Sequence, residues 1–370
     1  ADTGNEVTLF ALNTRKHFFD PAALPQWLTQ KITIHAVPVD TDIRFPALVK
    51  NLFFSRDPYI ARRFYDPTAE TALTELLRQN HFDVIQMEGP YLFSYLPAIR
   101  QHSTAKVSLR AHNVEHEIWR RKAAGENRPL HKAYLLNLAV RLKRFEKKCV
   151  EQSDYIIPIS TRDTRKFRTL GREIPMITIP AGMDIRTYEK AAPSIRGSLF
   201  FLGSLDWLPN QEGLAWFMKR VMPVLSNRHP HLQFHVAGRN APEEIRKLLH
   251  HPQVIFHGEV EHAGAFMQRY DIMVVPLLTG SGIRIKILEG LAMGKPVLTT
   301  PIGAEGIPSR DGVHLMIAGD SLSFVRKLEV LLSDSGLRKL IAENARQLIR
   351  ENFDTFTVSK QLGDFYKAQL

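Results

Sequence analysis

An apolar run followed by a glycine-rich turn is the feature of this sequence that most limits its fold. Residues 272–278 read Ile-Met-Val-Val-Pro-Leu-Leu, and Thr-Gly-Ser-Gly follows at 279–282. From Ile283 onward, apolar residues recur at helical spacing, at 283, 287, 288 and 291. The pattern predicts a strand, a glycine turn and a helix that begins near Ile283.

This turn is a candidate site for a phosphate group. Gly280 and Gly282 let the backbone approach a ligand closely, and the free N–H groups at a helix N-terminus attract an anion. Arg284 and Lys286 in the first helical turns would add positive charge, and Glu289 lies within reach of hydroxyl groups beside the phosphate. A single Gly-x-Gly turn before a helix is also common in α/β proteins that bind no phosphate there. The simplest ligand is a phosphate bonded to a hydroxylated sugar.

The stretch from Tyr270 to Ile307 resembles the C-terminal signature of the retaining glycosyltransferases of family 4. The shared pattern is Gly-x-Gly-x-Arg-x-Lys-Ile-Leu-Glu, then Ala-x-Gly-x-Pro-Val, a threonine pair and Gly-Ala-Glu-Gly-Ile. The resemblance implies an α/β protein of the GT-B fold, with two doubly wound Rossmann-like domains that face a central cleft. It implies transfer of a sugar from a nucleoside-diphosphate sugar to an acceptor hydroxyl, with retention at the anomeric carbon. Neither a metal nor another cofactor is expected, since helix-end N–H groups, Arg and Lys absorb the charge of the leaving diphosphate.

The sequence departs from the family pattern in two places. Many members carry an Arg and a Lys in the loop that opens the second domain, but residues 197–218 contain neither. The family motif has a glutamate eight positions before Glu289, and that position is Ser281 here. We therefore expect Arg239 and the basic residues of the turn to hold the diphosphate, and Glu289 to bind the ribose. The predicted donor-binding residues are Gly203, Ser204, Asn210, Arg239, Gly280, Ser281, Gly282, Ile283, Arg284, Lys286 and Glu289.

The first half of the chain carries most of its positive charge. The formal net charge is +11, with 29 Lys and Arg against 21 Asp and Glu in residues 1–195, and 20 against 17 in the remainder. Such an excess suits an anionic partner, whether a phosphate-bearing lipid, a membrane surface or a nucleic acid. Cys149 is the only cysteine, which excludes an intrachain disulfide and favours a reducing compartment. No apolar run is long enough to span a bilayer.

Alternating strands and helices in the first half predict a parallel sheet covered by helices. The strand-like segments are 6–12, 31–39, 83–88, 106–112, 155–160 and 176–180. Ligands of such sheets collect at the carboxyl ends of the strands. Polar residues follow several of these ends, and the ones that we assign to the acceptor side are Glu88, Arg110, Asn113 and Glu115.

His112 is the predicted catalytic residue. The stretch from His112 to Arg121 is similar to the acceptor-domain segment of family 4, in which a histidine at this place lines the cleft next to the donor sugar. Without that resemblance, a histidine that merely bonds a neighbouring loop is the more common case. Glu115, His116 and Glu117 are either cleft residues or the first turn of a helix, where acids are favoured.

Two stretches have the composition of an interfacial surface. Residues 44–56, continued by 62–65, mix basic residues with large aromatic ones. Residues 120–148 carry ten Lys and Arg against two acids, with an apolar stripe at helical spacing. A long helix that packs its stripe on the sheet explains the apolar residues. The basic excess favours peripheral docking to the anionic inner face of the cell membrane, and hence a cytoplasmic location.

The expected domains are 1–190 for the acceptor, 196–353 for the donor, and a terminal helix over 354–370 that crosses back to the first domain. A linker is predicted at 189–197, which has no period and carries Pro and Gly. Strands of the second domain are predicted at 198–203, 232–238, 254–257, 272–277, 296–300 and 313–317. Ala1 to Gly4 resembles the end of a helix, so we expect roughly 30–40 further residues upstream, about one strand–loop–helix unit.

The leading hypothesis is a glycosyltransferase of cell-envelope polysaccharide, lipopolysaccharide or glycolipid synthesis, with a glycan or a lipid-linked acceptor. One alternative is a GT-B epimerase or hydrolase of a nucleotide sugar, but no convincing set of carboxylates for proton abstraction is evident. The other alternative is a basic protein that binds a membrane or a nucleic acid without catalysis. Against nucleic acid, the basic residues lack interleaved stacking aromatics on a recognisable module.

Overall fold

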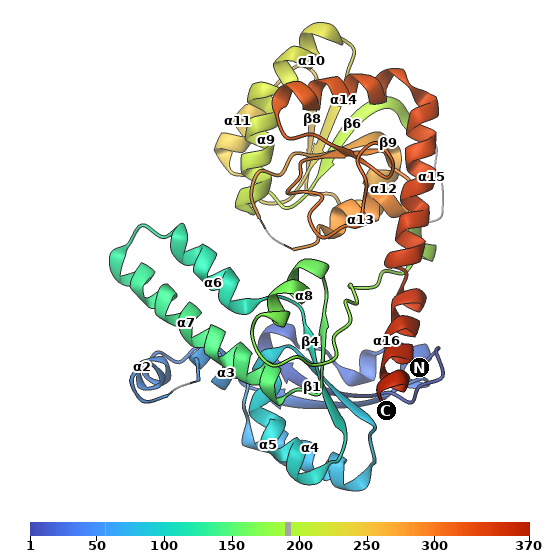
Figure 1. Cartoon of the computed structure of the whole chain (residues 1–370). Helices are drawn as coiled ribbons and strands as arrows, with labels where there is room; N and C mark the ends of the chain where they lie inside the picture. Colours follow the sequence, from blue (N-terminus) through green and yellow to red (C-terminus); the bar gives the residue numbers. More distant parts are fainter. Residues whose placement is uncertain (56, 189–193, 281) are drawn as a thin grey trace. The chain divides into compact units, whose positions relative to one another are not determined.

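The computed structural model describes residues 1–55, 57–188, 194–280 and 282–370, which form two compact units (Figure 1). Unit 1 comprises Ala1–Pro180 and Ser359–Leu370, and unit 2 comprises Ala181–Val358. Unit 1 thus ends at Pro180 and not at residue 190, because the residues after Pro180 bond within unit 2. Met183 N–H donates to Phe353 O at 2.8 Å, and Thr355 N–H donates to Met183 O at 3.0 Å. Most of the predicted linker lies outside the described residues.

Unit 1 contains two parallel sheets that the described residues do not join. Strand β1 (Thr8–Thr14) pairs with β2 (Thr33–Val39) over its whole length. The second sheet consists of β3 (Val84–Glu88), β4 (Lys106–Ala111) and β5 (Tyr155–Pro158), with β4 in the middle. The segment predicted as a strand at 176–180 is not a regular strand and forms one bridge, between Met176 and Ile156 of β5. Ile177 N–H and Ile179 N–H donate to Ile156 O and Pro158 O, at 3.4 and 3.0 Å, but Pro158 has no N–H to complete the ladder.

The helices of unit 1 connect or follow these strands in the chain. They are α1 (Gln26–Thr29), α2 (Phe45–Phe54), α3 (Tyr59–Arg62), α4 (Pro67–Gln79), α5 (Leu96–His102), α6 (Glu115–Ala124), α7 (Pro129–Gln152) and α8 (Thr161–Arg168). Residues 120–148 are therefore divided between two helices. Gly125 ends α6 and Pro129 occupies the first turn of α7, the positions that these residues favour. The apolar stripe of α7 is buried, as predicted, through Leu135, Leu138, Leu142 and Phe145.

Unit 2 is a doubly wound domain around a parallel sheet. Its strands within the described ranges follow the order β11-β10-β9-β6-β7-β8. Their bounds are β6 (Ile195–Leu202), β7 (Phe234–Ala237), β8 (Val254–Gly258), β9 (Tyr270–Val275), β10 (Val297–Thr299) and β11 (Met316–Ile317). The chain runs from β6 outward to β8 and then returns to β9 on the other side of β6. The strand order reverses between β6 and β9, where ligands of such sheets bind.

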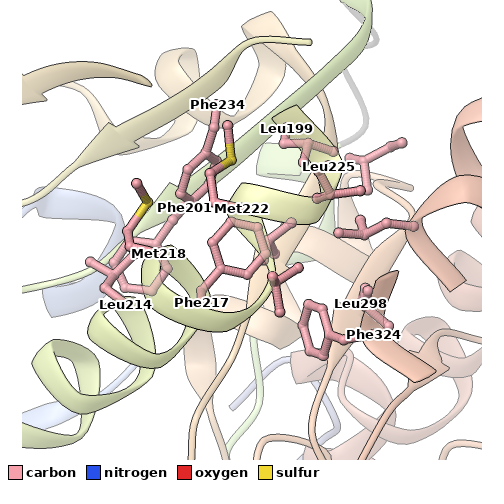
Figure 2. Close-up of a cluster of buried hydrophobic side chains, with 14 of the residues drawn as sticks. Leu199, Phe201, Leu214, Phe217, Met218, Met222, Leu225, Phe234, Leu298 and Phe324 are labelled. Carbon is pink, nitrogen blue, oxygen red and sulfur yellow. The ribbon is translucent and has the colours of Figure 1, made fainter. Parts of the chain in front are cut away.

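Two apolar cores fill the two faces of this sheet. Figure 2 shows the first, in which Phe201 and Phe234 from the strands meet Phe217 and Phe324 from helices. The second core contains Phe200, on the opposite face of β6 from Phe201, as the alternation of a strand requires. The helices are α9 (Leu208–Arg220), α10 (Met222–Arg228), α11 (Glu243–Leu249), α12 (Ala263–Arg269), α13 (Ile285–Ala292), α14 (Ser321–Ser333) and α15 (Ser335–Asn352).

The last helix, α16 (Thr355–Gln369), contains residues of both units. Its C-terminal part packs on the second sheet of unit 1. Tyr155 of β5 meets Phe365 edge to face, with ring centroids 5.7 Å apart, and its hydroxyl donates to Gln369 O at 3.0 Å. This part of α16 thereby covers the sheet that ends in Glu88 and Ala111.

Candidate functional site

The predicted site residues form two groups, one in each unit. The group in unit 2 lies at the point where its strand order reverses, after the ends of β6 and β9 (Figure 1). There, Gly203 follows β6 directly, and the glycine turn connects β9 to α13. Helix α13 begins at Ile285, with Arg284 as its N-cap, slightly later than the predicted start near Ile283. The positive φ angles of Gly280 and Gly282, +121° and +83°, keep the chain out of a helix before that point.

Lys286 is the centre of the group in unit 2. Its ammonium donates to Asn210 Oδ1 at 2.8 Å and lies 4.3 Å from the centroid of the Phe201 ring. Asn210 in turn donates to Ser204 O at 2.7 Å. A Cβ atom at Gly203 would lie 2.8 Å from both Lys286 Nζ and Asn210 Nδ2, so a larger residue here would displace these two side chains. Burial, and secondly the charge of Arg284, lowers the pKa of Lys286 to about 7.

Arg284 is a buried cation beside Lys286. Its guanidinium lies 5.3 Å from the centroid of the Trp207 ring, within the range of a cation–π contact. A Cβ atom at Gly280 would lie 2.5 Å from Arg284 Nη2, so the turn and the arginine fit together only with glycine at 280. Burial lowers the pKa of Arg284 from its usual value. Two cations held next to each other in a partly dry site are a suitable environment for a multiply charged anion.

The remaining predicted residues of unit 2 have more varied surroundings. Arg239 is exposed, and its Nε donates to Ser204 Oγ at 3.1 Å, which places it at the same loop as Gly203. Ile283 is half-buried and packs on the second core. Ser281 lies outside the described residues.

Glu289 is half-buried in α13 and accepts a hydrogen bond from the Tyr188 hydroxyl at 3.2 Å. Burial raises the pKa of Glu289, while the Tyr188 bond acts in the opposite direction. Tyr188 was not among the predicted residues.

A second carboxylate at the turn was missed by the sequence reasoning. Thr279 Oγ1 donates to Glu212 Oε2 at 2.6 Å, which brings the first half of α9 against the glycine turn. These residues are 67 positions apart, and Glu212 belongs to no motif. The contact could have been predicted from the topology alone. β6 and β9 are parallel neighbours, so the helix after β6 begins at the same edge of the sheet as the turn after β9.

In unit 1, His112 and Glu88 form a hydrogen-bonded pair. Glu88 ends β3 and His112 follows β4, and His112 Nε2 lies 2.7 Å from Glu88 Oε2. The other carboxylate oxygen of Glu88 accepts from Gln86 Nε2 at 2.5 Å. Burial by itself would raise the pKa of Glu88, but the bonds from His112 and Gln86 keep that pKa below its usual value. Both members of the pair are about half exposed, so a ligand can reach them.

Arg110 has a structural partner. Its buried guanidinium donates to Ile179 O at 2.6 Å and to Pro180 O at 3.0 Å, at the end of unit 1. Burial lowers the pKa of Arg110. Asn113 is exposed, two residues before α6 begins. Of the acceptor-side residues, Glu88 is thus the one that contacts His112 directly.

Glu115 and Glu117 lie in the first turn of α6, as one of the two interpretations of this stretch predicted. Here the buried carboxylate of Glu146 accepts from the backbone N–H groups of Glu115 and His116, at 2.7 and 3.0 Å, and so caps the helix. Glu115 Oε2 accepts from the Tyr91 hydroxyl at 2.7 Å, and burial raises the pKa of Glu115. The N-terminus of α6 therefore holds an anion supplied by the chain itself.

A cavity of about 580 Å³ lies between α7 and the end of α2, in the region of the predicted interfacial stretches. We call it the basic cavity; its lining residues are Leu52, Ser55, Asp57, Asn137, Arg141, Arg144, Phe145 and Lys148. Arg141 fixes the chain after α2 by donating to Ser55 O and Asp57 O, both at 2.8 Å. Arg144 and Lys148 are exposed at its rim, and Phe45 and Phe54, at the two ends of α2, are 75% and 85% exposed. Arg56 lies outside the described residues.

Across the described ranges, no three His, Cys, Asp or Glu side chains gather as a metal site. The same part of the chain contains no helix with the length and apolar character needed to cross a bilayer.

Known proteins resemble this chain in both sequence and fold. The family model "Glycosyl transferases group 1" matches residues 196–334, within unit 2. An uncharacterized 44.6 kDa protein in the cps region of Klebsiella pneumoniae is 25% identical over 299 residues, which cover 78% of this chain and 75% of that protein. A phosphatidyl-myo-inositol mannosyltransferase of Mycobacterium leprae is 26% identical over 205 residues, or 52% of this chain and 53% of that protein.

Among solved structures, Anabaena Alr3699/HepE in complex with UDP superimposes on this chain with a TM-score of 0.64. The match covers 98% of this chain and 100% of that protein, at 15% sequence identity. At that identity the likeness concerns the fold.

Proposed function

We propose that the chain is a group 1 glycosyl transferase that moves a sugar from a nucleoside-diphosphate sugar to an acceptor hydroxyl with retention at the anomeric carbon, because the family model of that name matches residues 196–334 and the chain has the GT-B fold. The observation that carries the proposal is the meeting of Lys286, Arg284 and Gly203 where the sheet of unit 2 reverses its strand order. Two cations and a close backbone approach at this place suit a diphosphate.

Lys286 and Arg284 hold the diphosphate in this proposal, and Arg239 adds charge from the loop after β7. The fully ionised Arg284 and the N–H groups at the start of α13 stabilise the negative charge that develops on the leaving diphosphate. Lys286, whose pKa falls to about 7 in the empty site, gains a proton when the phosphate oxygens replace the amide of Asn210 as its partner.

Two carboxylates select the hydroxyl groups of the donor. Glu289, in the second turn of α13, binds the ribose hydroxyls. Glu212 meets the glycine turn from α9 and binds a hydroxyl of the transferred sugar. A carboxylate from α9 thus serves beside Thr279, in a chain whose residue 281 is a serine instead of the glutamate of the family pattern.

His112 is the proposed catalytic residue of unit 1, and Glu88 orients it. An ionised Glu88 accepts the Nε2 proton of His112, which leaves Nδ1 as the nitrogen that accepts a hydrogen bond from the sugar. In the transfer, the bond between the anomeric carbon and the diphosphate oxygen breaks, and a bond to the acceptor oxygen forms on the same face. The acceptor proton passes to the departing phosphate oxygen, so the step needs no further base.

The acceptor is proposed to be a glycan or a lipid-linked molecule of cell-envelope polysaccharide or glycolipid synthesis. The names of the relatives support this class, since one lies in a cps region and another is a phosphatidyl-myo-inositol mannosyltransferase. The exposed Arg144 and Lys148 of α7, and the exposed Phe45 and Phe54 of α2, support contact with an anionic membrane, and hence action at its cytoplasmic face.

The test is an assay of the full chain with a panel of UDP-sugars and GDP-sugars, with and without a lipid extract. The proposal expects one donor to release its nucleoside diphosphate rapidly only when the extract is present. Equal release in both conditions would indicate a hydrolase, and conversion of the donor sugar to a stereoisomer would indicate an epimerase. Binding of lipid without consumption of any donor would indicate a non-catalytic membrane protein.

A further inference from the structure

We infer that Tyr366 of α16 is a positioning residue for His112, acting through Gln86 and Glu88. The inference rests on the proposed function, since it takes His112 as the catalytic side chain. It adds a role for the terminal helix, which otherwise only covers the sheet of unit 1.

A continuous row of hydrogen bonds connects Tyr366 to His112. The Tyr366 hydroxyl donates to Gln86 Oε1 at 2.6 Å, and Gln86 Nε2 donates to Glu88 Oε1 at 2.5 Å. Glu88 Oε2 then lies 2.7 Å from His112 Nε2. We call these four residues the relay.

The register of the sheet places the members of the relay on one face. Gln86 and Glu88 are two residues apart in β3, so their side chains point to the same side. Gln86 pairs with Ser108 of β4, and the Tyr366 hydroxyl also lies 2.8 Å from Ser108 Oγ. Tyr366 is therefore anchored to both strands at the register position next to Glu88.

Each bond of the relay fixes the direction of the next one. An ionised Glu88 only accepts, so the amide N–H of Gln86 must face it and the amide oxygen must face Tyr366. That oxygen requires a donor, and Tyr366 supplies one because burial raises its pKa to about 12 and keeps the phenol protonated. With one carboxylate oxygen of Glu88 held by Gln86, the other is held in place for Nε2 of His112.

Removal of the phenol oxygen tests this arrangement. In Y366F the amide of Gln86 has no donor on that side and is free to rotate, so Glu88 and His112 lose their fixed orientation. We expect turnover to fall about three- to tenfold, the effect of about one lost hydrogen bond, while the KM for the donor stays within twofold. Q86L should behave in the same way, and Y366F combined with H112A should lose no more activity than H112A alone.

Tyr155 offers a matched control. Its hydroxyl also bonds α16, through Gln369 O, but no bond leads from it to Glu88. Y155F should keep full turnover, although it weakens the attachment of the same helix. The inference would be overturned if Y155F and Y366F lost turnover equally, or if Y366F kept full turnover. It would also be overturned if Y366F lowered the turnover of H112A further in the double variant.

A spectroscopic readout separates this inference from the proposed function. Nitrogen NMR of His112 reports whether the proton of the neutral imidazole sits on Nε2 or Nδ1. Wild type and Y155F should show Nε2 protonated, and Y366F should show a mixture. An unchanged imidazole in Y366F would overturn the relay whatever the activity assay gives. Full turnover in H112A would instead refute the catalytic role of His112, and the positioning role of Tyr366 with it.

Discussion

Lys286 Nζ lies 2.8 Å from Asn210 Oδ1, so the first turn of α13 is bonded to the first turn of α9 across the point where the sheet of unit 2 reverses its order. This bond joins the starts of the two helices that the proposed diphosphate would touch. The lysine is held in place by a neutral amide and an aromatic ring, neither of which balances its charge.

The pKa of Lys286 near 7 predicts proton uptake when a nucleoside diphosphate binds. Above pH 7 the empty site holds mostly neutral lysine, whereas the phosphate favours the ammonium and raises its pKa again. Binding at pH 8 should therefore take up as much as about one proton, and affinity should fall as pH rises from 7 to 9. Calorimetry of UDP and GDP in buffers of different ionisation enthalpy measures the uptake. The K286R variant has a positive side chain at every pH and should bind the nucleotide without proton uptake. Binding to the wild type without proton uptake would refute the role of Lys286 at the diphosphate.

Replacement of Glu289 by alanine should weaken donor binding and leave the fold intact. Its carboxylate is half-buried and contacts the Tyr188 hydroxyl, so it contributes little packing. The loss of a charged hydrogen-bond partner of ribose should cost about 1.5–3 kcal/mol of donor affinity. Calorimetry measures the affinity of E289A for the nucleoside diphosphate that the wild type binds. Y188F serves as the control, since it removes the Tyr188 contact and keeps the carboxylate. Unchanged affinity in E289A would remove Glu289 from the site.

Glu212 should affect the sugar donor and not the free nucleotide. If it binds a hydroxyl of the transferred sugar, E212Q lowers the affinity for the nucleotide sugar by about tenfold and leaves that for the nucleoside diphosphate unchanged. Glu243, an exposed acid at the start of α11, gives a matched change of charge in E243Q. Equal losses for sugar-bearing and sugar-free nucleotides would place Glu212 at the diphosphate or in the support of the turn.

Replacement of His112 by alanine should lower turnover far more than donor affinity. The proposed diphosphate-binding residues belong to unit 2 and His112 to unit 1, so most of the expected donor contacts survive the change. A fall in kcat of about 10²-fold or more, with a donor Kd within about threefold, is the expected pattern for a group that acts in the transition state. Comparable losses in both quantities would indicate that His112 has a structural role.

The basic cavity predicts binding to anionic vesicles. Arg144 and Lys148 are exposed at its rim, and each is expected to contribute about 1 kcal/mol near an anionic surface. R144A combined with K148A should reduce co-sedimentation with vesicles that contain phosphatidylglycerol, and high salt should reduce it for the wild type. K219A on α9, an exposed lysine of unit 2, serves as the control. Equal binding to neutral vesicles would contradict the electrostatic account.

Features coded by neighbouring residues were predicted well from the sequence. The strand, turn and helix around Gly280 follow from local apolar spacing, and the structure places them where expected to within a few residues. The break between α6 and α7 was equally local, since Gly125 and Pro129 mark it, but the continuous basic stretch concealed it. The segment 176–180 pairs with β5 but is not a regular strand, because Pro158 interrupts the ladder of hydrogen bonds.

Contacts between segments that are distant in the chain could not be predicted from the sequence. The bond from Thr279 to Glu212 depends on the order of strands in the sheet. At the end of unit 1, the guanidinium of Arg110 in β4 binds the carbonyl groups of Ile179 and Pro180, about 70 positions further along the chain. Each of these contacts follows from topology, and none leaves a periodic signal in the chain.

The anomeric configuration of the product tests the central claim most directly. The full chain would be incubated with its preferred nucleotide sugar and a purified acceptor, and the new glycosidic bond would be followed by proton NMR as it forms. The account predicts a bond with the same configuration as the donor, formed at the rate at which nucleoside diphosphate appears. An inverted bond, or nucleoside diphosphate released without any new bond, would contradict it.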